Sequence, residues 1–334
     1  MHICYKFRKY KKKIITSFLN AQGINDIKFT WFSFRAKSLA KKYNATVVQW
    51  ASKQNHEVNR FCKENNLPLL FVEDGFIRSK GLGAFHNIPS SLVFDNLGIY
   101  YNPKGSRLFE ILKSIKKRDD HDALVLRAQK LKDILINSKV SKYNLTSDLE
   151  VNEIETLKKS LPKDKKIILV PGQVEDDASV LTGGMGIKSN LELLKEVRSH
   201  NEDAFIIFKP HPDVVYGKRE DISKVSTNAK SAYDAIVYHA NILKIFNLVD
   251  EIHTLTSLSG FEALIRNKKV CVYGKPFYAG WGLTHDYHHF KDRDIVLSLD
   301  ELIAGALILY PLYINWDTNK LCEVEDVVKH LENS

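Results

Sequence analysis

Short apolar runs alternate with longer amphipathic segments along this chain. The apolar runs, rich in β-branched and aromatic side chains, occupy residues 45–50, 69–72, 167–170, 204–208, 251–255, 270–273 and 295–297. Segments with helical spacing occupy residues 57–65, 190–199, 229–246 and 261–266. Continuous apolar strands separated by helices are typical of a parallel sheet that helices cover on both faces. The pattern therefore predicts the α/β class.

A polar, charge-rich helical stretch at residues 119–159 divides the apolar runs into two groups, and Pro162 introduces the next strand. We place the domain boundary near residue 160. The expected organisation is an N-terminal Rossmann-like domain at 1–160, a C-terminal one at 161–310, and a tail at 311–334 that packs back on the N-terminal domain. Two such domains facing one another would enclose a central cleft at the carboxyl ends of their strands.

Composition excludes several classes of protein. The chain has 334 residues, 44% hydrophobic and 27% charged, which rules out disordered, collagen-like and disulfide-rich scaffolds. No apolar run approaches the ~20 residues that span a bilayer, and the first residues make a poor secretory signal. Four scattered cysteines without a CxxC pair indicate a reducing compartment and argue against a structural zinc site. We expect a soluble cytoplasmic protein.

The net charge of +9 is concentrated at the start of the chain. Six basic residues stand among the first thirteen, with aromatic residues between them: Lys6, Arg8, Lys9, Lys11, Lys12 and Lys13, interleaved with Tyr5, Phe7 and Tyr10. A nucleic-acid tail, a foot on an anionic membrane and a solvated terminus are the three alternatives. Because the rest of the chain has no nucleic-acid-binding signature, we predict the membrane foot and no nucleic-acid partner.

Chemistry-bearing residues follow the strand at 69–72. Glu73, Asp74 and Arg78 come within a glycine-containing loop. Arg78 has the geometry to bind a carboxylate or phosphate through two hydrogen bonds. The alternative is a structural turn in which one of the acids pairs with Arg78.

Three consecutive acids follow the strand at 167–170. Glu175, Asp176 and Asp177 stand ahead of the glycine-rich stretch 182–186. They suit a divalent metal site, a general base or a carboxylate nucleophile. Acids stabilised by the dipole at a helix N-terminus are the alternative.

Three further loops carry candidate binding groups. Lys209 and His211, the latter between two prolines, indicate an anion site after residues 204–208. Hydroxyls and a glycine at residues 256–260 open a helix, which favours either a phosphate or ordinary N-capping there. The aromatic and glycine-rich loop 277–284 suits stacking on a base or a sugar. The histidines just beyond that loop fit a solvated segment better than a metal site.

Taken in order, these blocks resemble a known family. The blocks are residues 73–79, 92–95, 98–101, 141–145, 171–179, 209–213, 256–264 and 277–284. Together they are similar to the capsule-polysaccharide β-Kdo glycosyltransferases, the KpsC-type enzymes, over residues 67–313. The resemblance implies a GT-B-like arrangement of two Rossmann-like domains, and retaining transfer of Kdo from CMP-β-Kdo without a cofactor or metal. It also implies a glycan or glycolipid acceptor at the inner face of the bacterial inner membrane, and so a peripheral location there.

The family's site residues carry over to matching positions. The resemblance places the covalent nucleophile on Asp177. Retention by double displacement also needs an acid/base group, for which we expect Glu73 of the N-terminal domain. The implied substrate-binding residues are Asp74, Arg78, Ser79, Gln173, Lys209, His211, Thr256, Ser257, Ser259, Gly260, Glu262, Tyr278 and Trp281. In contrast to typical members, which fuse two transferase modules, this chain matches one, with motifs closer to the second. Asn96 and Asn102 stand where acids are expected.

Two other functions compete with glycosyl transfer. One is a metal-dependent nucleotide-sugar epimerase or hydrolase that uses the acids at 175–177 as ligands. The other is a non-catalytic, membrane-tethered glycan-binding accessory protein. Turnover of CMP-β-Kdo with an acceptor, and its response to a chelator, separates the three.

Overall fold

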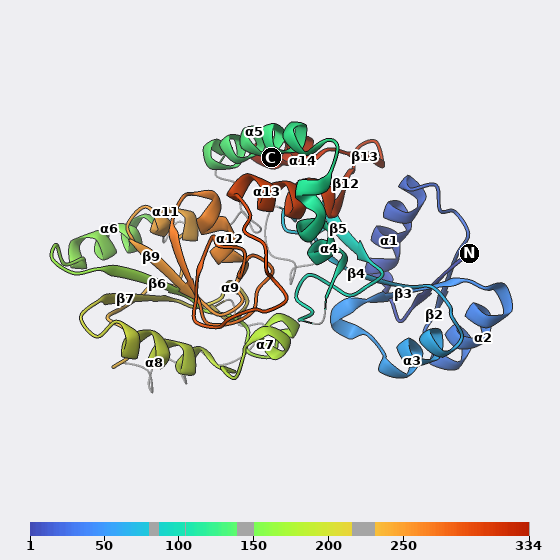
Figure 1. The fold of residues 1–334 in the computed structure, drawn as a ribbon, viewed down its shortest axis with the longest axis horizontal. Coiled ribbons are helices and arrows are strands. Elements are labelled where there is room, and N and C mark those ends of the chain that lie inside the picture. The colour runs from blue at the N-terminus through green and yellow to red at the C-terminus, as the bar shows by residue number, and fades with distance from the viewer. Residues whose placement is uncertain (80–86, 104, 139–149, 216–230, 334) are drawn as a thin grey trace. The chain divides into compact units, whose positions relative to one another are not determined.

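The computed structural model describes residues 1–79, 87–103, 105–138, 150–215 and 231–333. The chain divides into two compact units, each with its own sheet (Figure 1). The first unit comprises Met1–Ile134 and Ile303–Ser334, and the second comprises Leu135–Leu302. Both sheets contain parallel strands with helices between them, which confirms the predicted α/β class.

The first unit contains a seven-stranded sheet in the order β13-β12-β5-β4-β3-β1-β2. Its strands are β1 (His2–Tyr5), β2 (Ile27–Thr30), β3 (Thr46–Trp50), β4 (Leu69–Asp74), β5 (Ser91–Asp95), β12 (Pro311–Asn315) and β13 (Lys320–Cys322). The strands from β1 to β4 pair in parallel, whereas β5, β12 and β13 pair antiparallel with their neighbours. The chain runs from β1 outward to β2 and returns on the other side of β1 to β3.

Helices connect and cover these strands. They are α1 (Lys9–Ala21), α2 (Ser33–Tyr43), α3 (His56–Glu64), α4 (Arg107–Ser114), α5 (His121–Ser138) and α14 (Val324–Asn333), with short 3₁₀ turns η1 (Ala51–Lys53) and η3 (Ile115–Lys117) and a π turn η4 (Ala304–Leu309). Helix α13 (Leu299–Ile303) precedes η4, and its residues 299–302 belong to the second unit. Cys4 of β1 packs in the core beside α1, while Ile3 and Tyr5 pack beside α2 and α3. Successive strand residues thus enter opposite cores, which explains the continuous apolar runs.

The basic start of the chain belongs to this fold and does not extend from it as a tail, while its predicted contact with an anionic membrane stays a prediction. β1 lies between β2 and β3, and the basic residues fall in the following loop and in α1. Tyr5 and Phe7, which we expected at a lipid headgroup, are 5% and 2% exposed. The charge density concealed a short strand whose apolar residues are part of the core.

The segment 311–334 also belongs to the first unit. β12 pairs with β5, with Tyr313 opposite Ser91, and Ile314 lies in the core beside α1. The Arg127 guanidinium of α5 lies 2.6 Å from Glu323 and 2.7 Å from Glu325. The C-terminal segment therefore completes the first sheet.

The domain boundary differs from the predicted one near residue 160. It falls within α5, and α6 (Glu150–Ser160) belongs to the second unit. The Glu153 carboxylate of α6 accepts hydrogen bonds from the backbone N–H groups of Tyr238, His239 and Ala240 at 2.6–2.7 Å. These long-range bonds, which a polar helical pattern does not reveal, tie α6 to the second sheet.

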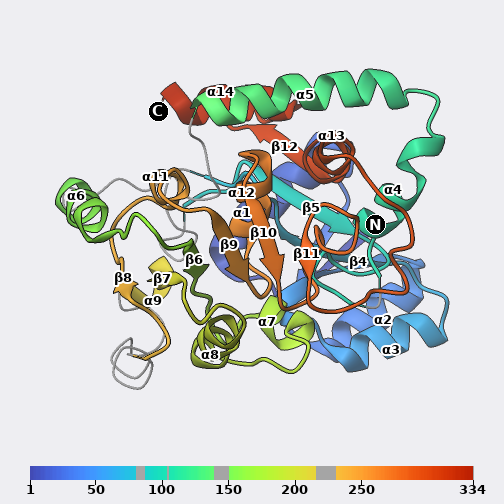
Figure 2. The same ribbon diagram turned by 60° about the vertical axis from the view of Figure 1, so that its left-hand side comes forward.

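The second unit contains a six-stranded parallel sheet in the order β11-β10-β9-β6-β7-β8 (Figure 2). The strands are β6 (Ile167–Pro171), β7 (Phe205–Lys209), β8 (Ala235–Ile236), β9 (Glu251–Thr254), β10 (Lys269–Val272) and β11 (His285–Asp286). The helices are α6, α7 (Ala178–Gly183), α8 (Asn190–His200), α9 (Pro212–Val215), α11 (Ile242–Phe246) and α12 (Leu258–Ile265). With its first strand central and successive strands added on either side, this is the strand order of the Rossmann fold.

Two predicted elements of the second unit differ. Residues 295–297 form no strand, since Val296 is 68% exposed and Leu297 instead donates its N–H to the Trp281 carbonyl. The predicted helix at 229–246 is reduced to α11 within the part the structure describes. The block at 141–145 and residues 80–83 lie outside the described residues. In the described part of the chain, no helix has both the length and the apolar character needed to cross a membrane.

The core position of Ile314 generates a stability prediction. Ile314→Ala should lower the free energy of unfolding of the first unit by about 2–5 kcal/mol, because Ile314 is 1% exposed and its truncation leaves a cavity. Leu321→Ala, at a 41% exposed position of the same segment, should change it by less than about 0.5 kcal/mol. Urea denaturation followed by circular dichroism measures both. Equal effects would mean that the segment does not contribute to the core.

Candidate active site

The second sheet gathers the candidate residues at one edge. β6, β7 and β9 are neighbouring parallel strands, so the loops that follow them leave at the same side. β7 lies on one side of β6 and β9 lies on its other side. The connections that leave β6 and β9 therefore run in opposite directions along the sheet. Such a switch point in the strand order is where sheets of this kind bind ligands. The structure thus brings together the predicted loops at 173–179, 209–213 and 256–260.

A chain of hydrogen bonds crosses this switch point. The Gln173 amide donates to Thr256 Oγ1 at 2.8 Å and accepts from the Thr256 N–H at 2.9 Å. The Thr256 hydroxyl lies 3.5 Å from Ser179 Oγ, which in turn donates to Asp177 Oδ2 at 2.7 Å. Hydroxyls linked in this way orient one another, so the Asp177 carboxylate is held from the far side of the switch point.

Asp177 is the N-cap of α7, as the alternative interpretation expected. Its Oδ2 accepts from the Ser179 N–H at 3.2 Å as well as from the Ser179 hydroxyl. Its other oxygen, Oδ1, accepts no hydrogen bond from the residues that the structure describes. The capping hydrogen bonds therefore fix the Asp177 side chain through Oδ2 and leave Oδ1 available to react with a substrate.

The neighbouring acids have different surroundings. Glu175 accepts from the Asn190 N–H at 2.7 Å at the start of α8, whereas Asp176 is exposed. Asn190 also donates to the Gln173 carbonyl and accepts from its N–H, both at 2.8 Å. Within the described residues, the acids at 175–177 do not form a group that could share one metal ion. Glu175 has a structural role here.

Lys209 is the last residue of β7, and His211 lies in the loop that follows it. Lys209 is 7% exposed, and its ammonium donates to the Tyr238 carbonyl at 3.2 Å. Burial lowers the pKa of Lys209 to about 8, although Glu153 and Glu150 act in the opposite direction. The Asp213 N–H donates to His211 Nδ1 at 3.1 Å, which leaves the proton of a neutral ring on Nε2. The two side chains supply N–H donors suited to an anion.

The start of α12 is closely packed against an aromatic loop. Ser257 is its N-cap and accepts from the Ser259 N–H at 3.2 Å. The Tyr278 hydroxyl donates to the Ser257 carbonyl, and a Cβ at Gly260 would lie 2.3 Å from that hydroxyl. Gly260 is thus required for the close approach of Tyr278. Glu262 is half-buried on the same helix.

The expectation that Tyr278 and Trp281 stack on a base or sugar is not met. Both side chains are fully buried, and the Trp281 ring N–H donates to the Phe277 carbonyl at 2.7 Å. A ring without exposed surface offers no face to a ligand. Tyr278 instead packs against the start of α12.

In the first unit, Glu73 stands at the end of β4 in a buried polar environment. It is 8% exposed and accepts from the Ser52 N–H at 3.1 Å and the Tyr101 hydroxyl at 3.2 Å. Burial raises the pKa of the Glu73 carboxyl, as does the nearby Asp74 charge, while Lys11 acts to lower it. A carboxyl group with a raised pKa is suited to proton transfer.

Asp74 forms the turn pairing that we considered as an alternative. Its Oδ2 lies 2.9 Å from Arg78 Nε, and Arg78 Nη1 donates to the Ser79 hydroxyl at 2.8 Å. Asp74 Oδ1 is buried with no hydrogen-bond partner among the described residues. A buried acceptor without a partner is costly, so this oxygen is a candidate to bind a substrate hydroxyl.

Sequence reasoning missed three groups around Glu73. Tyr101 lay in a matched block without an assigned role, and Ser52 contributes a backbone donor that no motif marks. Lys11 was assigned to the basic tail, yet its ammonium lies 2.9 Å from the centroid of the Trp50 ring, and burial lowers its pKa to about 8. Recognition of strand β1 would have indicated that Lys11 lies near the sheet edge that carries Glu73.

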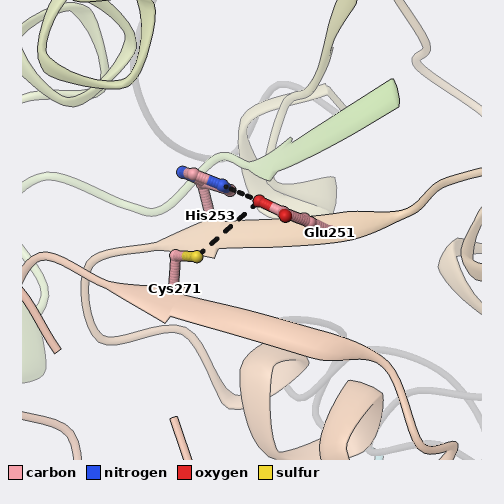
Figure 3. A group of neighbouring side chains, drawn as sticks. All are labelled: Glu251, His253 and Cys271. Atoms are coloured by element: carbon pink, nitrogen blue, oxygen red, sulfur yellow. Dashed lines mark hydrogen bonds and ion pairs between the residues drawn. The ribbon is translucent and has the colours of Figure 1, made fainter. Parts of the chain in front are cut away.

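Glu251, His253 and Cys271 form the one group among the described residues whose ligand atoms could reach a common metal ion (Figure 3). Their ligand atoms lie within 4.8 Å of one another. However, Glu251 lies 2.6 Å from Lys269 and 3.4 Å from Lys166, and its other oxygen lies 3.0 Å from His253. Burial would raise the pKa of Glu251, but the hydrogen bonds from Lys269 and His253 lower it to about 2. An ion-pair cluster at the amino ends of β9 and β10 accounts for the arrangement.

This cluster generates a pH prediction. Burial lowers the pKa of His253 to about 4, against the raising effect of Glu251. Between about pH 6.5 and 4 the unfolded chain therefore binds a proton that the folded chain refuses, so the free energy of unfolding of the second unit falls as the pH falls, by roughly 3 kcal/mol over this window. In His253→Gln this slope should flatten, whereas it should persist in the control His285→Gln, at an exposed position. Denaturation at a series of pH values measures it, and an unchanged slope in His253→Gln would exclude His253 as its source.

Comparison with known proteins adds to this geometry. The sequence profile described as "Capsule polysaccharide biosynthesis protein" matches residues 45–313. The capsule polysaccharide modification protein LipA of Neisseria meningitidis serogroup B is 40% identical over 98% of this chain and 45% of its own length. The lipopolysaccharide-processing protein LpsZ of Rhizobium meliloti is 37% identical over 85% of this chain and 63% of its own length. The chain thus spans about half to two thirds of the length of these curated relatives.

Two solved structures of KpsC from Thermosulfurimonas dismutans are similar throughout. The one titled β-Kdo 2,7 transferase is 36% identical with a TM-score of 0.77, covering 99% of this chain and 98% of its own. The one titled β-Kdo 2,4 transferase is 27% identical with a TM-score of 0.79, covering 98% and 97%. Both similarities agree with two Rossmann-like units and with the predicted family. This chain belongs to the capsule polysaccharide biosynthesis protein family.

Proposed function

We propose that this chain is a retaining β-Kdo glycosyltransferase that transfers Kdo from CMP-β-Kdo to a glycan or glycolipid acceptor of a capsule or other surface polysaccharide. The observation that carries the proposal is the hydrogen-bonded chain from Gln173 to Asp177, at the switch point of the second sheet. It stands in a chain that is similar over nearly its whole length to β-Kdo transferases. The higher identity to the 2,7 transferase favours that linkage.

The charges at this edge suit the donor. CMP-β-Kdo carries two anionic groups, the sugar carboxylate and the phosphate diester. Lys209 at the end of β7 and His211 just after it provide donors, and the first N–H groups of α12 provide others after β9. We assign the CMP phosphate to His211 with Ser257 and Ser259 beside it.

Retention requires two displacements at the anomeric carbon, C2 of Kdo. In the first, Asp177 Oδ1 attacks C2 and the C2–O bond to the phosphate breaks, so that CMP leaves with the bonding electrons. In the second, an acceptor hydroxyl attacks C2, the bond to Asp177 breaks, and the hydroxyl proton passes to Glu73. The Ser179 hydrogen bonds to Oδ2 hold the nucleophile, and the environment of Glu73 raises its proton affinity.

The proposed reaction determines the binding partners of the protein and its location in the cell. The partners are CMP-β-Kdo and a glycan or glycolipid acceptor, with Asp74 Oδ1 as a candidate acceptor contact. No cofactor takes part in either displacement. We propose the cytoplasm, at the inner face of the inner membrane, as the location of this chemistry.

Asp177 is the first test of this proposal. Asp177→Asn should abolish Kdo transfer, because an amide is a poor nucleophile, while CMP binding survives. The exposed neighbour variant Asp176→Asn should keep most of the activity. Transfer assays with CMP-β-Kdo and synthetic acceptors, run with and without a chelator, measure this. If Asp177→Ala keeps more than about a hundredth of the wild-type rate, a covalent role for Asp177 is wrong; loss of activity on chelation would favour the metal-dependent alternative.

His211 tests the donor site separately. His211→Ala should weaken CMP binding about 10- to 100-fold, the range expected for losing a hydrogen bond to a charged group. His285→Ala, at an exposed position of β11, should leave CMP affinity unchanged. Titration calorimetry with CMP measures both. Unchanged affinity in His211→Ala would assign His211 a structural role.

A further inference from the structure

Three large aromatic side chains are exposed next to one another at the edge of the first sheet. Trp31, Phe32 and Phe34, between β2 and the first turn of α2, are 51%, 54% and 64% exposed. The ring centroids of Phe32 and Phe34 lie 5.7 Å apart. Single exposed apolar residues are normal, but three within four positions form a patch of the kind that marks an interaction surface.

Basic residues surround this patch. β1 and β2 are paired, and the Lys6 N–H donates to the Thr30 carbonyl at 2.9 Å, so the loop after β1 lies beside the aromatic loop (Figure 1). That loop and the start of α1 carry Lys6, Arg8 and Lys9, all exposed. Neither α1 nor α2 contains an acidic residue, whereas α2 contains Arg35, Lys37, Lys41 and Lys42.

We infer that this aromatic–basic surface, formed by Lys6, Arg8, Lys9, Trp31, Phe32 and Phe34, docks on an anionic lipid bilayer. Tryptophan and phenylalanine partition into the headgroup region, and each nearby Lys or Arg adds roughly 1 kcal/mol of attraction to an anionic leaflet. The charge complementarity selects a lipid surface over a neutral apolar partner. The proposal differs from a basic tail, because folded loops present the contact and its aromatic residues come from 31–34.

The surface faces the same way as the Glu73 site. β1, β3 and β4 are neighbouring parallel strands, so their carboxyl ends share one edge with that of β2. At about 4.8 Å between adjacent strands, β4 lies roughly 14 Å from β2. A docked bilayer would thus lie at the edge that carries Glu73 and Asp74. An acceptor anchored in lipid would reach this edge without leaving the membrane surface.

Vesicle sedimentation with the full chain tests the inference. Wild-type protein should sediment with phosphatidylglycerol-containing vesicles and not with pure phosphatidylcholine. The triple variant Trp31→Ser, Phe32→Ser, Phe34→Ser should lose about tenfold or more of this binding. Arg8→Gln with Lys9→Gln should weaken it and reduce its salt dependence. Leu126→Ser with Leu321→Ser, at other exposed apolar positions, should bind like wild type.

Transfer to a small soluble acceptor separates docking from catalysis, since the triple variant should keep that activity. The inference is overturned if the wild type does not sediment with anionic vesicles, or if the triple variant sediments fully. If the wild type binds a protein or a soluble glycan through this surface and does not bind vesicles, the surface belongs to that partner instead. Should the triple variant not fold, brominated lipids provide a second measurement. They should quench wild-type tryptophan fluorescence, and Trp31→Phe should lose that quenching while still sedimenting.

Discussion

The paired hydrogen bonds between the Gln173 amide and Thr256 tie together the two loops that diverge at the switch point of the second sheet. These bonds set the spacing between the loop after β6 and the helix start after β9. Through Thr256 and Ser179 the same connection extends to Asp177. The position of the proposed nucleophile therefore depends on a bridge between two strands that are neighbours in space and far apart in the chain. Such preorganisation holds a reacting group in position before the reaction, so that no reorganisation is needed during it.

Burial adjusts the chemistry of the groups around these sites. Lys209 in the second unit and Lys11 in the first are both buried enough to lower their pKa values to about 8, and each lies near carboxylates that favour its charge. Burial raises the pKa of Glu73, which is held by a backbone donor and a tyrosine hydroxyl. Burying such groups costs folding free energy, and a protein retains them where their altered proton affinity serves a function. The Glu251–His253 pair, at the opposite end of its strands, is instead explained by ion pairing with lysines.

The candidate residues at the strand ends were predictable from the sequence, because each apolar run is followed directly by polar residues. The loops after β6, β7 and β9 could be expected to meet, since parallel strands place their carboxyl ends together. Residues whose role depends on long-range contacts escaped prediction. The sequence indicated that Lys11 belongs to a charged tail, because β1 is too short to be recognised. It indicated that Trp281 stacks on a ligand, because no neighbouring residue in the sequence shows that Trp281 is buried. Glu153 joined α6 to the second unit through backbone donors that have no sequence signature.

The anomeric configuration of the product is the most direct test of the account. The protein would be incubated with CMP-β-Kdo and a synthetic Kdo-terminated acceptor, and the purified product analysed by nuclear magnetic resonance. Two successive displacements, each of which inverts the configuration at C2, predict a β-linked Kdo with the configuration of the donor retained. An α-linked product would show a single displacement and contradict a nucleophilic Asp177. Hydrolysis without any transfer would contradict the assignment as a glycosyltransferase.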